Sequence, residues 1–213
     1  MNRIELHNTL PCVFEGRDVQ SEVWLQDVTL QKGETYLVEA SSGTGKSSLC
    51  SYIIGYRKDY SGNICFDGKD IRRYKVSDWT SLRKRTLSLL FQELRLFPEL
   101  TALENVEIKN GLTGYKSSRE IASWFERLGI AEKMNAKVGR RSFGQQQRVA
   151  MIRALVQPFD FLLVDEPISH LDDENGRIMG SIMMEEAMRL GAGVLVTSIG
   201  KHMDLPYTKT FRL

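Results

Sequence analysis

Residues 39–48 read Glu39-Ala40-Ser41-Ser42-Gly43-Thr44-Gly45-Lys46-Ser47-Ser48. The apolar run Tyr36-Leu37-Val38 precedes them, and a helical pattern over 49–54 follows, with Gly55 near its end. A glycine-rich turn between a strand and a helix lets backbone N–H groups point inward at a phosphate, and the helix dipole adds to the attraction. The pattern therefore predicts a phosphate-binding loop over 40–48.

Two side chains of this loop are expected to carry its chemistry. Lys46 is placed to reach the β- and γ-phosphates of ATP, and Ser47 is placed to hold Mg²⁺. The other expected ATP contacts from the loop are Ser42, Gly43, Thr44, Gly45 and Ser48. The usual pattern is Gly-x-x-x-x-Gly-Lys-Ser/Thr, and Ala40 stands where its first glycine belongs. The alternative is a strand-to-helix turn that binds no ligand.

A second pattern typical of a phosphate site is Phe161-Leu162-Leu163-Val164-Asp165-Glu166, a buried-strand run that ends in two acids. An open α/β sheet binds its ligand at the carboxyl ends of its strands. We expect Asp165 to support the Mg²⁺ shell and Glu166 to polarise the attacking water, because phosphoryl transfer needs an oriented nucleophile. Without Lys46 upstream, a solvated strand end would explain the two acids equally well.

Short apolar runs alternate with helical patterns along most of the chain, as in an α/β sheet covered by helices. The runs at 86–91 and 161–164 are typical of buried strands. Residues 4–30 differ, because Glu22-Val23-Trp24-Leu25 and Val28-Thr29-Leu30 are typical of short strands with few helical signals between them. We expect a small antiparallel sheet ahead of the parallel one.

Helical patterns dominate the middle of the chain. Ser117-Ser118-Arg119-Glu120 is a capping box that begins a helix over 118–128, and Gly129 is placed to end it. The last long helix is expected between Asp172 and Leu190, followed by a strand at 194–197.

Composition narrows the class of protein. A chain of 213 residues with 42% hydrophobic residues can bury a core as one domain, or as one domain with an inserted lobe. A net charge of +2 is too small to require nucleic acid, and we expect no such partner. We interpret the clusters Arg72-Arg73, Arg83-Lys84-Arg85 and Arg140-Arg141 as solvated faces.

Cysteine usage and hydropathy predict the compartment. The chain has an odd number of cysteines, Cys12, Cys50 and Cys65, and they lack metal-ligand spacing. This pattern favours a reducing compartment. We expect the three cysteines to be small packing residues. No run approaches the roughly 18 to 20 apolar residues that cross a bilayer, and Met1-Asn2-Arg3 is followed by mixed polar residues. We expect a soluble chain that needs separate membrane subunits for any role in transport.

The segment Ser142-Phe143-Gly144-Gln145-Gln146-Gln147-Arg148-Val149-Ala150 narrows the family. It resembles the signature Leu-Ser-Gly-Gly-Gln of ATP-binding cassette (ABC) proteins with its usual continuation, and it lies between the phosphate loop and the Asp-Glu strand as in that family. The resemblance implies that Ser142 and the Gly144 backbone bind the γ-phosphate held by an opposite subunit, with Gln145 as a further ATP contact, so that two cassettes sandwich two ATP molecules. A helix N-terminus with a hydroxyl and free N–H groups suits an anion.

The same resemblance implies a fold and a domain division. The fold is a P-loop NTPase core of ABC type, in the α/β class, with an N-terminal antiparallel β-subdomain and an inserted α-helical subdomain. Residues 1–92 and 143–213 would form the RecA-like core with its β-subdomain, and residues 93–142 the inserted lobe.

Other landmarks follow in family order. Gln92 resembles the Q-loop glutamine that touches Mg²⁺ and the attacking water, although a polar residue at a strand end is the alternative. Ser169-His170-Leu171-Asp172 resembles the D-loop, in which Asp172 organises the dimer interface, and otherwise reads as a helix N-cap. Phe14 is the candidate for the aromatic that stacks on adenine, with a core aromatic as the alternative.

Three departures from the family pattern bear on activity. Besides Ala40, Arg141 and Phe143 replace the signature leucine and its first glycine, and Ser198 stands where the family carries a switch histidine near the γ-phosphate. Losing one preorganised contact costs on the order of 10²- to 10³-fold in rate. We therefore expect slow hydrolysis rather than none. His202 lies too far along the chain to replace the histidine unless a displaced loop brings it near.

The short length and Leu100-Thr101-Ala102-Leu103-Glu104-Asn105-Val106 resemble the cassettes of lipoprotein release, macrolide-type export and cell division. The expected function is ATP binding and hydrolysis that drives integral-membrane permease subunits from the cytoplasmic face of the membrane, beside a second ATP-binding subunit in a homodimer or heterodimer. The alternatives are a nucleotide-gated regulatory module with little hydrolysis and a soluble ABC ATPase.

Overall fold

The chain forms two sheets and six α-helices in a computed structural model that describes residues 1–168 and 172–213. A five-stranded parallel sheet has the order β6-β7-β8-β3-β9. Its strands are β3 (Thr35–Glu39), β6 (Leu87–Leu90), β7 (Phe161–Asp165), β8 (Gly193–Ser198) and β9 (Lys209–Arg212). The predicted strands at 86–91, 161–164 and 194–197 are thereby confirmed.

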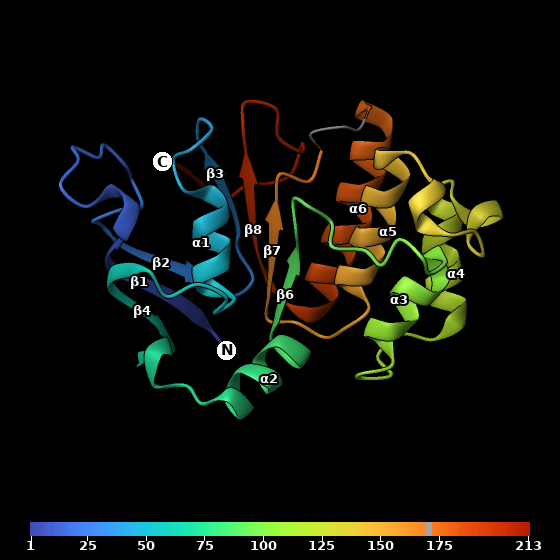
Figure 1. Ribbon diagram of the computed structural model, residues 1–213, viewed down its shortest axis with the longest axis horizontal. Coiled ribbons are helices and arrows are strands. Elements are labelled where there is room, and N and C mark those ends of the chain that lie inside the picture. Colours follow the sequence, from blue (N-terminus) through green and yellow to red (C-terminus); the bar gives the residue numbers. More distant parts are fainter. Residues whose placement is uncertain (169–171) are drawn as a thin grey trace.

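An antiparallel sheet of order β2-β1-β4-β5 packs beside the first helix (Figure 1). Its strands are β1 (Arg3–Pro11), β2 (Asp27–Gln31), β4 (Tyr60–Phe66) and β5 (Lys69–Asp70). The predicted N-terminal antiparallel sheet is confirmed, and β4 and β5, which follow the first helix in sequence, extend it.

The α-helices are α1 (Lys46–Ile53), α2 (Val76–Arg85), α3 (Ala102–Asn110), α4 (Ser118–Arg127), α5 (Phe143–Leu155) and α6 (Asp173–Leu190). Four 3₁₀ turns are η1 (Cys12–Phe14), η2 (Ile71–Arg73), η3 (Ala131–Lys133) and η4 (Val138–Arg140). In Figure 1, α1 lies on one side of the parallel sheet, and α5 and α6 lie on the other. This arrangement is an α/β fold with helices on both faces of the sheet, as the sequence predicted.

Both faces of the parallel sheet are buried, because alternate residues of a strand point to opposite faces. Leu162 and Val164 of β7 belong to one hydrophobic core, which they share with α3, α4, α5 and α6. Phe161 and Leu163 belong to a second core, which they share with α1 and the antiparallel sheet. The sheet is thus fixed from two sides, and its carboxyl edge is a rigid base for a ligand site.

The predicted strand at 22–25 is wrong. Ser21 bends the chain there, because its hydroxyl accepts hydrogen bonds from the backbone N–H groups of Val23 (3.0 Å) and Trp24 (2.9 Å). Leu25 has a positive φ of 58°. The bend drives Trp24 into the core, where it is 1% exposed, so this apolar segment is an anchored turn.

The helix predicted from the capping box begins and ends as expected. Ser117 accepts a hydrogen bond from the N–H of Glu120, and the Glu120 carboxylate accepts one in return from the N–H of Ser117 (2.9 Å). Gly129 follows α4 with a φ of +63°, a conformation that favours glycine. The helix α6, capped by Asp172, also agrees with the prediction.

Helices α3 and α4 fall within residues 93–142, and α5 packs against both of them as well as against β6 and α6. This helix therefore connects the helical part of the molecule to the parallel sheet. The division of the chain at residues 92 and 142 stays a prediction.

Candidate functional site

The loop of residues 40–45 joins β3 to α1 at the carboxyl edge of the parallel sheet. Gly43 and Gly45 have positive φ angles of 85° and 100°. A Cβ on Gly45 would lie 3.1 Å from the Trp24 ring and 3.2 Å from the Phe14 ring. Gly45 is therefore required both by its backbone conformation and by the close approach of two aromatic rings.

Trp24 supports the phosphate loop through a hydrogen bond, a role that the sequence analysis did not predict. Its indole N–H donates a hydrogen bond of 3.0 Å to the carbonyl of Thr44. The Thr44 hydroxyl donates to the carbonyl of Ser41 (2.9 Å), so the Thr44 side chain is turned back onto the loop. A buried indole N–H needs a hydrogen-bond acceptor. From the sequence, this requirement alone could have indicated that Trp24 packs against a backbone carbonyl.

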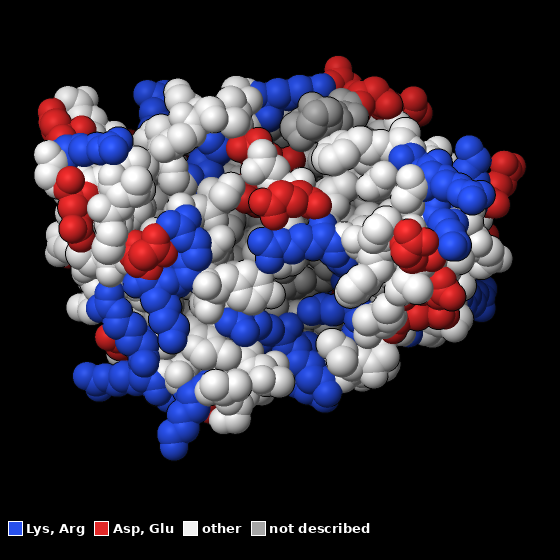
Figure 2. Space-filling view, in the orientation of Figure 1, with Lys and Arg blue, Asp and Glu red and all other residues white. Residues whose placement is uncertain are grey.

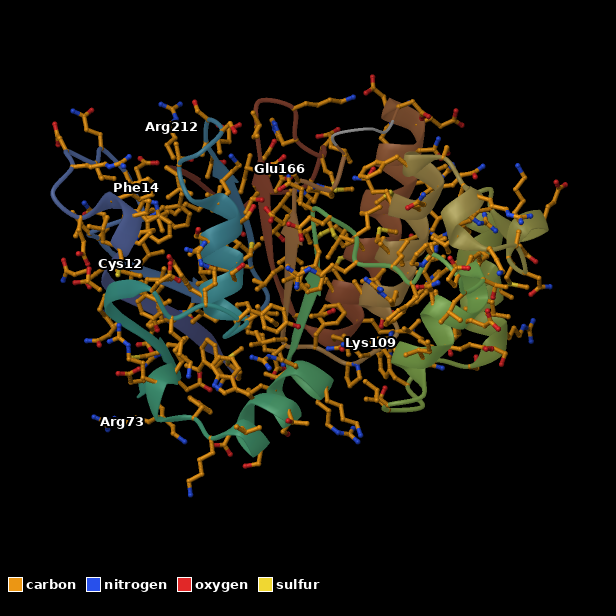
Figure 3. All side chains as sticks on the ribbon, in the orientation of Figure 1. Cys12, Phe14, Arg73, Lys109, Glu166 and Arg212 are labelled. Atoms are coloured by element: carbon orange, nitrogen blue, oxygen red, sulfur yellow. The ribbon has the colours of Figure 1, made fainter. Side chains whose placement is uncertain are left out.

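A cavity of about 260 Å³ opens above the loop. The residues lining it are Val13, Phe14, Ser42, Gly43, Gly45, Lys46, Ser47, Ser48, Gln92, Glu166 and Ile199. Phe14 comes from the N-terminal segment and Glu166 from the carboxyl end of β7, on either side of α1 (Figure 3). The structure thus brings most of the predicted ATP-binding and catalytic residues to one cavity, although they are distant in sequence.

Four of these side chains form a connected set. The Lys46 ammonium donates to the carbonyl of Ser41 (2.8 Å) and lies 3.6 Å from Glu166 Oε1. Gln92 donates from Nε2 to Glu166 Oε2 (3.0 Å) and accepts at Oε1 from the Ser47 hydroxyl (3.4 Å). The predicted Q-loop glutamine therefore links the loop to the acid at the end of β7.

Asp165 lies behind this set rather than in the lining of the cavity. It is 6% exposed, and it accepts a hydrogen bond of 2.6 Å from the hydroxyl of Thr197, its neighbour on β8. Burial, with a further contribution from the Asp165 charge, holds the pKa of the Cys50 thiol well above its usual value. Cys50 is therefore a packing residue, as predicted, whereas Cys12 is exposed and does not meet that prediction.

The cavity offers two neutral oxygens to a cation, Ser47 Oγ and Gln92 Oε1. Among residues 1–168 and 172–213, no group of three or more histidine, cysteine or acidic side chains gathers round a metal position. Such a donor set fits Mg²⁺, which keeps its waters and takes phosphate oxygens, rather than a metal that needs an all-protein cage.

Ser48 is held by a partner that the sequence did not reveal. Arg57 donates from Nη1 to the Ser48 hydroxyl (2.8 Å) and from Nε to Asp59 (2.9 Å). The Arg57 guanidinium lowers the pKa of Asp59, and Asp59 raises the pKa of Arg57. Because arginine can only donate, the Ser48 hydroxyl accepts this hydrogen bond, which fixes its oxygen at the edge of the cavity.

The structure explains two of the departures from the family pattern, those at Ala40 and Ser198. Ala40 does not have a positive φ, and its N–H donates to the carbonyl of Ser198 (3.1 Å), so its methyl group replaces a glycine where no glycine conformation is needed. Ser198 is 2% exposed, its hydroxyl donates to the carbonyl of Lys201, and it does not line the cavity. His202 lies 3.8 Å from Glu39 and is also outside the lining.

The signature-like segment begins α5 and does not line this cavity. Ser142 caps the helix by accepting a hydrogen bond of 3.3 Å from the N–H of Gln145, and Gly144 stands in the first turn. Phe143 is 41% exposed. The structure thus presents Ser142, Gly144 and Gln145 apart from the phosphate loop of their own chain.

Hydrogen bonds tie α5 to the elements that flank the cavity. Gln147 donates to the carbonyl of Pro167, the residue after Glu166. Arg148 donates to Asn175 Oδ1 (2.6 Å), and Asn175 donates in turn to Asp172. Asp172 is the N-cap of α6, the alternative that the sequence left open, while Ser169, His170 and Leu171 of the predicted D-loop lie outside the described residues.

Comparisons with known proteins agree with this geometry. The family described as "ABC transporter" matches residues 26–169. The chain is 39% identical to the lipoprotein-releasing system ATP-binding protein LolD of Geobacter metallireducens, over 88% of this chain and 84% of that protein. It is 35% identical to a macrolide export ATP-binding/permease protein, MacB 1/2 of Paracoccus denitrificans, over 70% of this chain and 23% of that protein.

A solved structure supports the same assignment. It is the dimeric structure of a post-hydrolysis state of the ATP-binding cassette MJ0796 bound to ADP and Pi, with a TM-score of 0.73 and 28% identity over 92% of this chain and 87% of that one. The relatives represent the lipoprotein-release and macrolide-export group that the sequence motifs indicated. On its motifs, its fold and these similarities, the chain belongs to the ABC transporter family as an ATP-binding cassette ATPase.

Proposed function

We propose that this cassette binds Mg-ATP and hydrolyses it to drive a separate membrane partner of the lipoprotein-release or export kind. The observation that carries the proposal is the connected set Lys46, Glu166, Gln92 and Ser47 round one cavity. These four side chains supply the cation, the carboxylate and the oxygen ligands that phosphoryl transfer requires.

Each residue has a distinct task in this proposal. The Lys46 ammonium neutralises phosphate charge, and the loop N–H groups cradle the phosphates. Glu166 accepts a hydrogen bond from the attacking water, which Gln92 helps to orient. Ser47 and Gln92 would hold Mg²⁺, with Asp165 beneath them, and the bound ion supplies charge stabilisation at the phosphates. Phe14 would stack on the adenine ring at the far end of the cavity.

Completion of the site needs a second cassette. Ser142, Gly144 and Gln145 begin a helix whose N-terminus suits an anion, yet they lie outside the cavity of their own chain. In the proposed head-to-tail dimer they bind the γ-phosphate on the partner cassette, and Asp172 lies near the interface. ATP then stabilises the closed dimer, and hydrolysis reopens it.

The membrane partner and the location rest on the relatives. LolD is named as the ATP-binding protein of a lipoprotein-releasing system, and MacB as an export ATP-binding/permease protein. No helix among the described residues is long and apolar enough to cross a bilayer. By analogy with these relatives, we assign the transmembrane work to permease subunits and this chain to the cytoplasmic face of the membrane.

Nucleotide titration with Lys46→Ala tests the binding half of the proposal. The wild-type chain should bind ATP, and the variant should lose at least tenfold in affinity because the ammonium that neutralises phosphate charge is gone. Normal ATP binding by Lys46→Ala would overturn the site assignment. No ATP binding by the wild-type chain would overturn the function.

A nucleotide-gated regulatory module is the second candidate, and Ser198 favours it. This residue replaces the switch histidine, is buried, and bonds its hydroxyl to Lys201 rather than reaching the cavity. Loss of such a contact lowers the rate by about 10²- to 10³-fold. Single-turnover hydrolysis by the wild-type chain and by Glu166→Gln separates the two candidates. An ATPase hydrolyses ATP as the wild type and stops in the variant, whereas a binding-only module hydrolyses none in either form.

A further inference from the structure

The segment from Lys69 to Arg85 carries a concentrated positive charge. It contains seven basic residues, Lys69, Arg72, Arg73, Lys75, Arg83, Lys84 and Arg85, against two acids, Asp70 and Asp78, a net charge of +5. The whole chain has a net charge of +2, so the remaining residues together carry −3. The charge of the molecule is therefore polarised toward this segment.

None of the seven basic side chains forms an ion pair within residues 1–168 and 172–213. Elsewhere in the described residues some exposed cations have acidic partners, such as Arg57 with Asp59 and Arg127 with Glu185, and others, such as Arg119 and Lys133, stand singly rather than in a cluster. An ordinary solvated face mixes the two signs, and this face does not.

The two acids of the segment are engaged with backbone rather than with these cations. Asp70 accepts a hydrogen bond of 2.8 Å from the N–H of Arg72, at the start of η2. Asp78 accepts one of 2.8 Å from the N–H of Lys75, in the capping box of α2. Both carboxylates thus serve helix N-termini. Arg72 and Arg83 donate hydrogen bonds to backbone carbonyls, but these neutral partners leave the positive charge of the segment in place.

The segment also carries one highly exposed apolar side chain. Val76, the first residue of α2, is 84% exposed and follows Arg72, Arg73 and Lys75, all of which are exposed. Figure 2 shows basic side chains along the lower edge of the molecule with few acids among them, and Figure 3 shows Arg73 pointing outward there. We call this edge the α2 surface, formed by Lys69, Arg72, Arg73, Lys75, Val76, Lys84 and Arg85.

We propose that the α2 surface binds the anionic phospholipid headgroups of the membrane beside the permease. The inference rests on the proposed function, in which this cassette works at a membrane. A cluster of four to eight basic residues is attracted to an anionic leaflet, with about a 5-fold gain in affinity per residue. The Val76 side chain then enters the boundary between headgroups and acyl chains, as apolar residues of interfacial helices do.

The exposed valine favours a lipid surface over nucleic acid. Phosphate binding by a nucleic-acid-binding protein needs cations and hydrogen-bond donors, and an exposed valine within such a segment contributes neither. At a bilayer the same side chain leaves water. The charge and the apolar tip together therefore match a membrane.

Vesicle co-sedimentation of the full chain tests the proposal. The probes are phosphatidylcholine vesicles and vesicles in which roughly one third of the lipid is phosphatidylglycerol. We expect binding to the anionic vesicles alone, weakening as salt rises. Arg73→Gln with Lys75→Gln should lower the partition coefficient about 30-fold, and Val76→Ser should lower it about fivefold.

The matched control is Arg119→Gln with Lys133→Gln, which removes the same charge from exposed positions on the helical part of the chain. It should change vesicle binding less than threefold. Lys46→Ala should bind vesicles like the wild type, and Arg73→Gln with Lys75→Gln should bind ATP like the wild type. Failure of the nucleotide site and failure of the α2 surface are thereby distinguishable.

Three results would overturn the proposal. The first is equal binding to zwitterionic and anionic vesicles, or none to either. The second is an equal loss in the control variant, which would reduce the effect to net charge. The third is tighter binding to duplex DNA than to anionic vesicles in the same buffer, which would make nucleic acid the partner. Unchanged binding by Val76→Ser would overturn the role of Val76.

Discussion

The ammonium nitrogen of Lys46 lies 3.6 Å from Oε1 of Glu166, and both side chains are largely buried. Lys46 also donates to the carbonyls of Ser41 (2.8 Å) and Ala40 (3.3 Å). Its charge is therefore satisfied before any nucleotide arrives. An incoming phosphate must compete with the Glu166 carboxylate for Lys46. The two negatively charged groups also repel each other.

Glu166→Gln should consequently tighten ATP binding while it abolishes turnover. Removing the carboxylate ends both its competition for Lys46 and its repulsion of phosphate, and we expect affinity to rise about 3- to 10-fold. Calorimetric titration of ATP measures the change. Glu126→Gln, an exposed change on α4, should leave affinity as it was. Weaker binding by Glu166→Gln would show that the carboxylate does not compete for Lys46.

Trp24→Phe should weaken nucleotide binding without removing the core aromatic. The change deletes the indole N–H that donates to Thr44 and leaves a carbonyl short of one hydrogen bond, a cost of about 1 kcal/mol or fivefold in affinity. ATP and ADP should be affected alike, because the whole loop loses its support. Trp124→Phe, in the helical part of the chain, is the control for a lost tryptophan. Equal effects of the two variants would mean that general packing, and not the loop contact, explains the loss.

Arg57→Ala should lower ATP affinity about 3- to 10-fold while leaving stability nearly unchanged. Arg57 holds the hydroxyl of Ser48, which lines the cavity. Its ion pair with Asp59 is solvent-exposed, and such pairs contribute less than about 1 kcal/mol. Arg127→Ala breaks a similar exposed pair with Glu185 and should leave ATP affinity unchanged. Urea unfolding and ATP titration of both variants check the prediction, which fails if the two variants bind ATP equally.

The capping box of α4 should make stability depend on pH in acid. Hydrogen bonds from the backbone and hydroxyl of Ser117, and then from Lys116, lower the pKa of Glu120 from 4.5 to about 2. Between these values the unfolded chain binds more protons than the folded chain, so the free energy of unfolding falls as pH falls from about 4.5 toward 2.

Glu120→Gln should flatten this part of the pH profile, because the variant has no carboxylate to protonate. Urea unfolding at several pH values measures the slope, and Glu126→Gln again serves as the control. An unchanged slope in Glu120→Gln would assign the acid sensitivity to other groups.

Local patterns in the sequence predicted the phosphate loop and its helix well. Lys46 and Ser47 follow a buried strand and begin α1, as their glycine-rich context requires. Glu166 was predictable because a buried strand ends in acids at the edge where parallel strands present ligands. In each case the residues that define the feature are neighbours in sequence.

The rest of the site depends on contacts between distant residues. Trp24 lies in a segment whose apolar residues mimic a strand, and only the hydroxyl of Ser21 reveals the bend. Arg57 contacts Ser48 because the chain turns after α1, and no spacing in the sequence predicts that contact. Ser198 occupies a predicted site position, but the bond of its hydroxyl to Lys201 keeps it out of the cavity lining.

The hydrogen bond from Gln147 to Pro167 joins two neighbourhoods that serve different nucleotides in the proposed dimer. In that proposal, Pro167 follows Glu166, which acts on the cassette's own ATP, and Gln147 belongs to α5, which binds the ATP of the partner cassette. A shift of the turn at Pro167 after hydrolysis would therefore be transmitted to α5, whose N-terminus binds the other nucleotide in the proposed dimer. This hydrogen bond is therefore a direct route by which the two sites of the proposed dimer can affect each other.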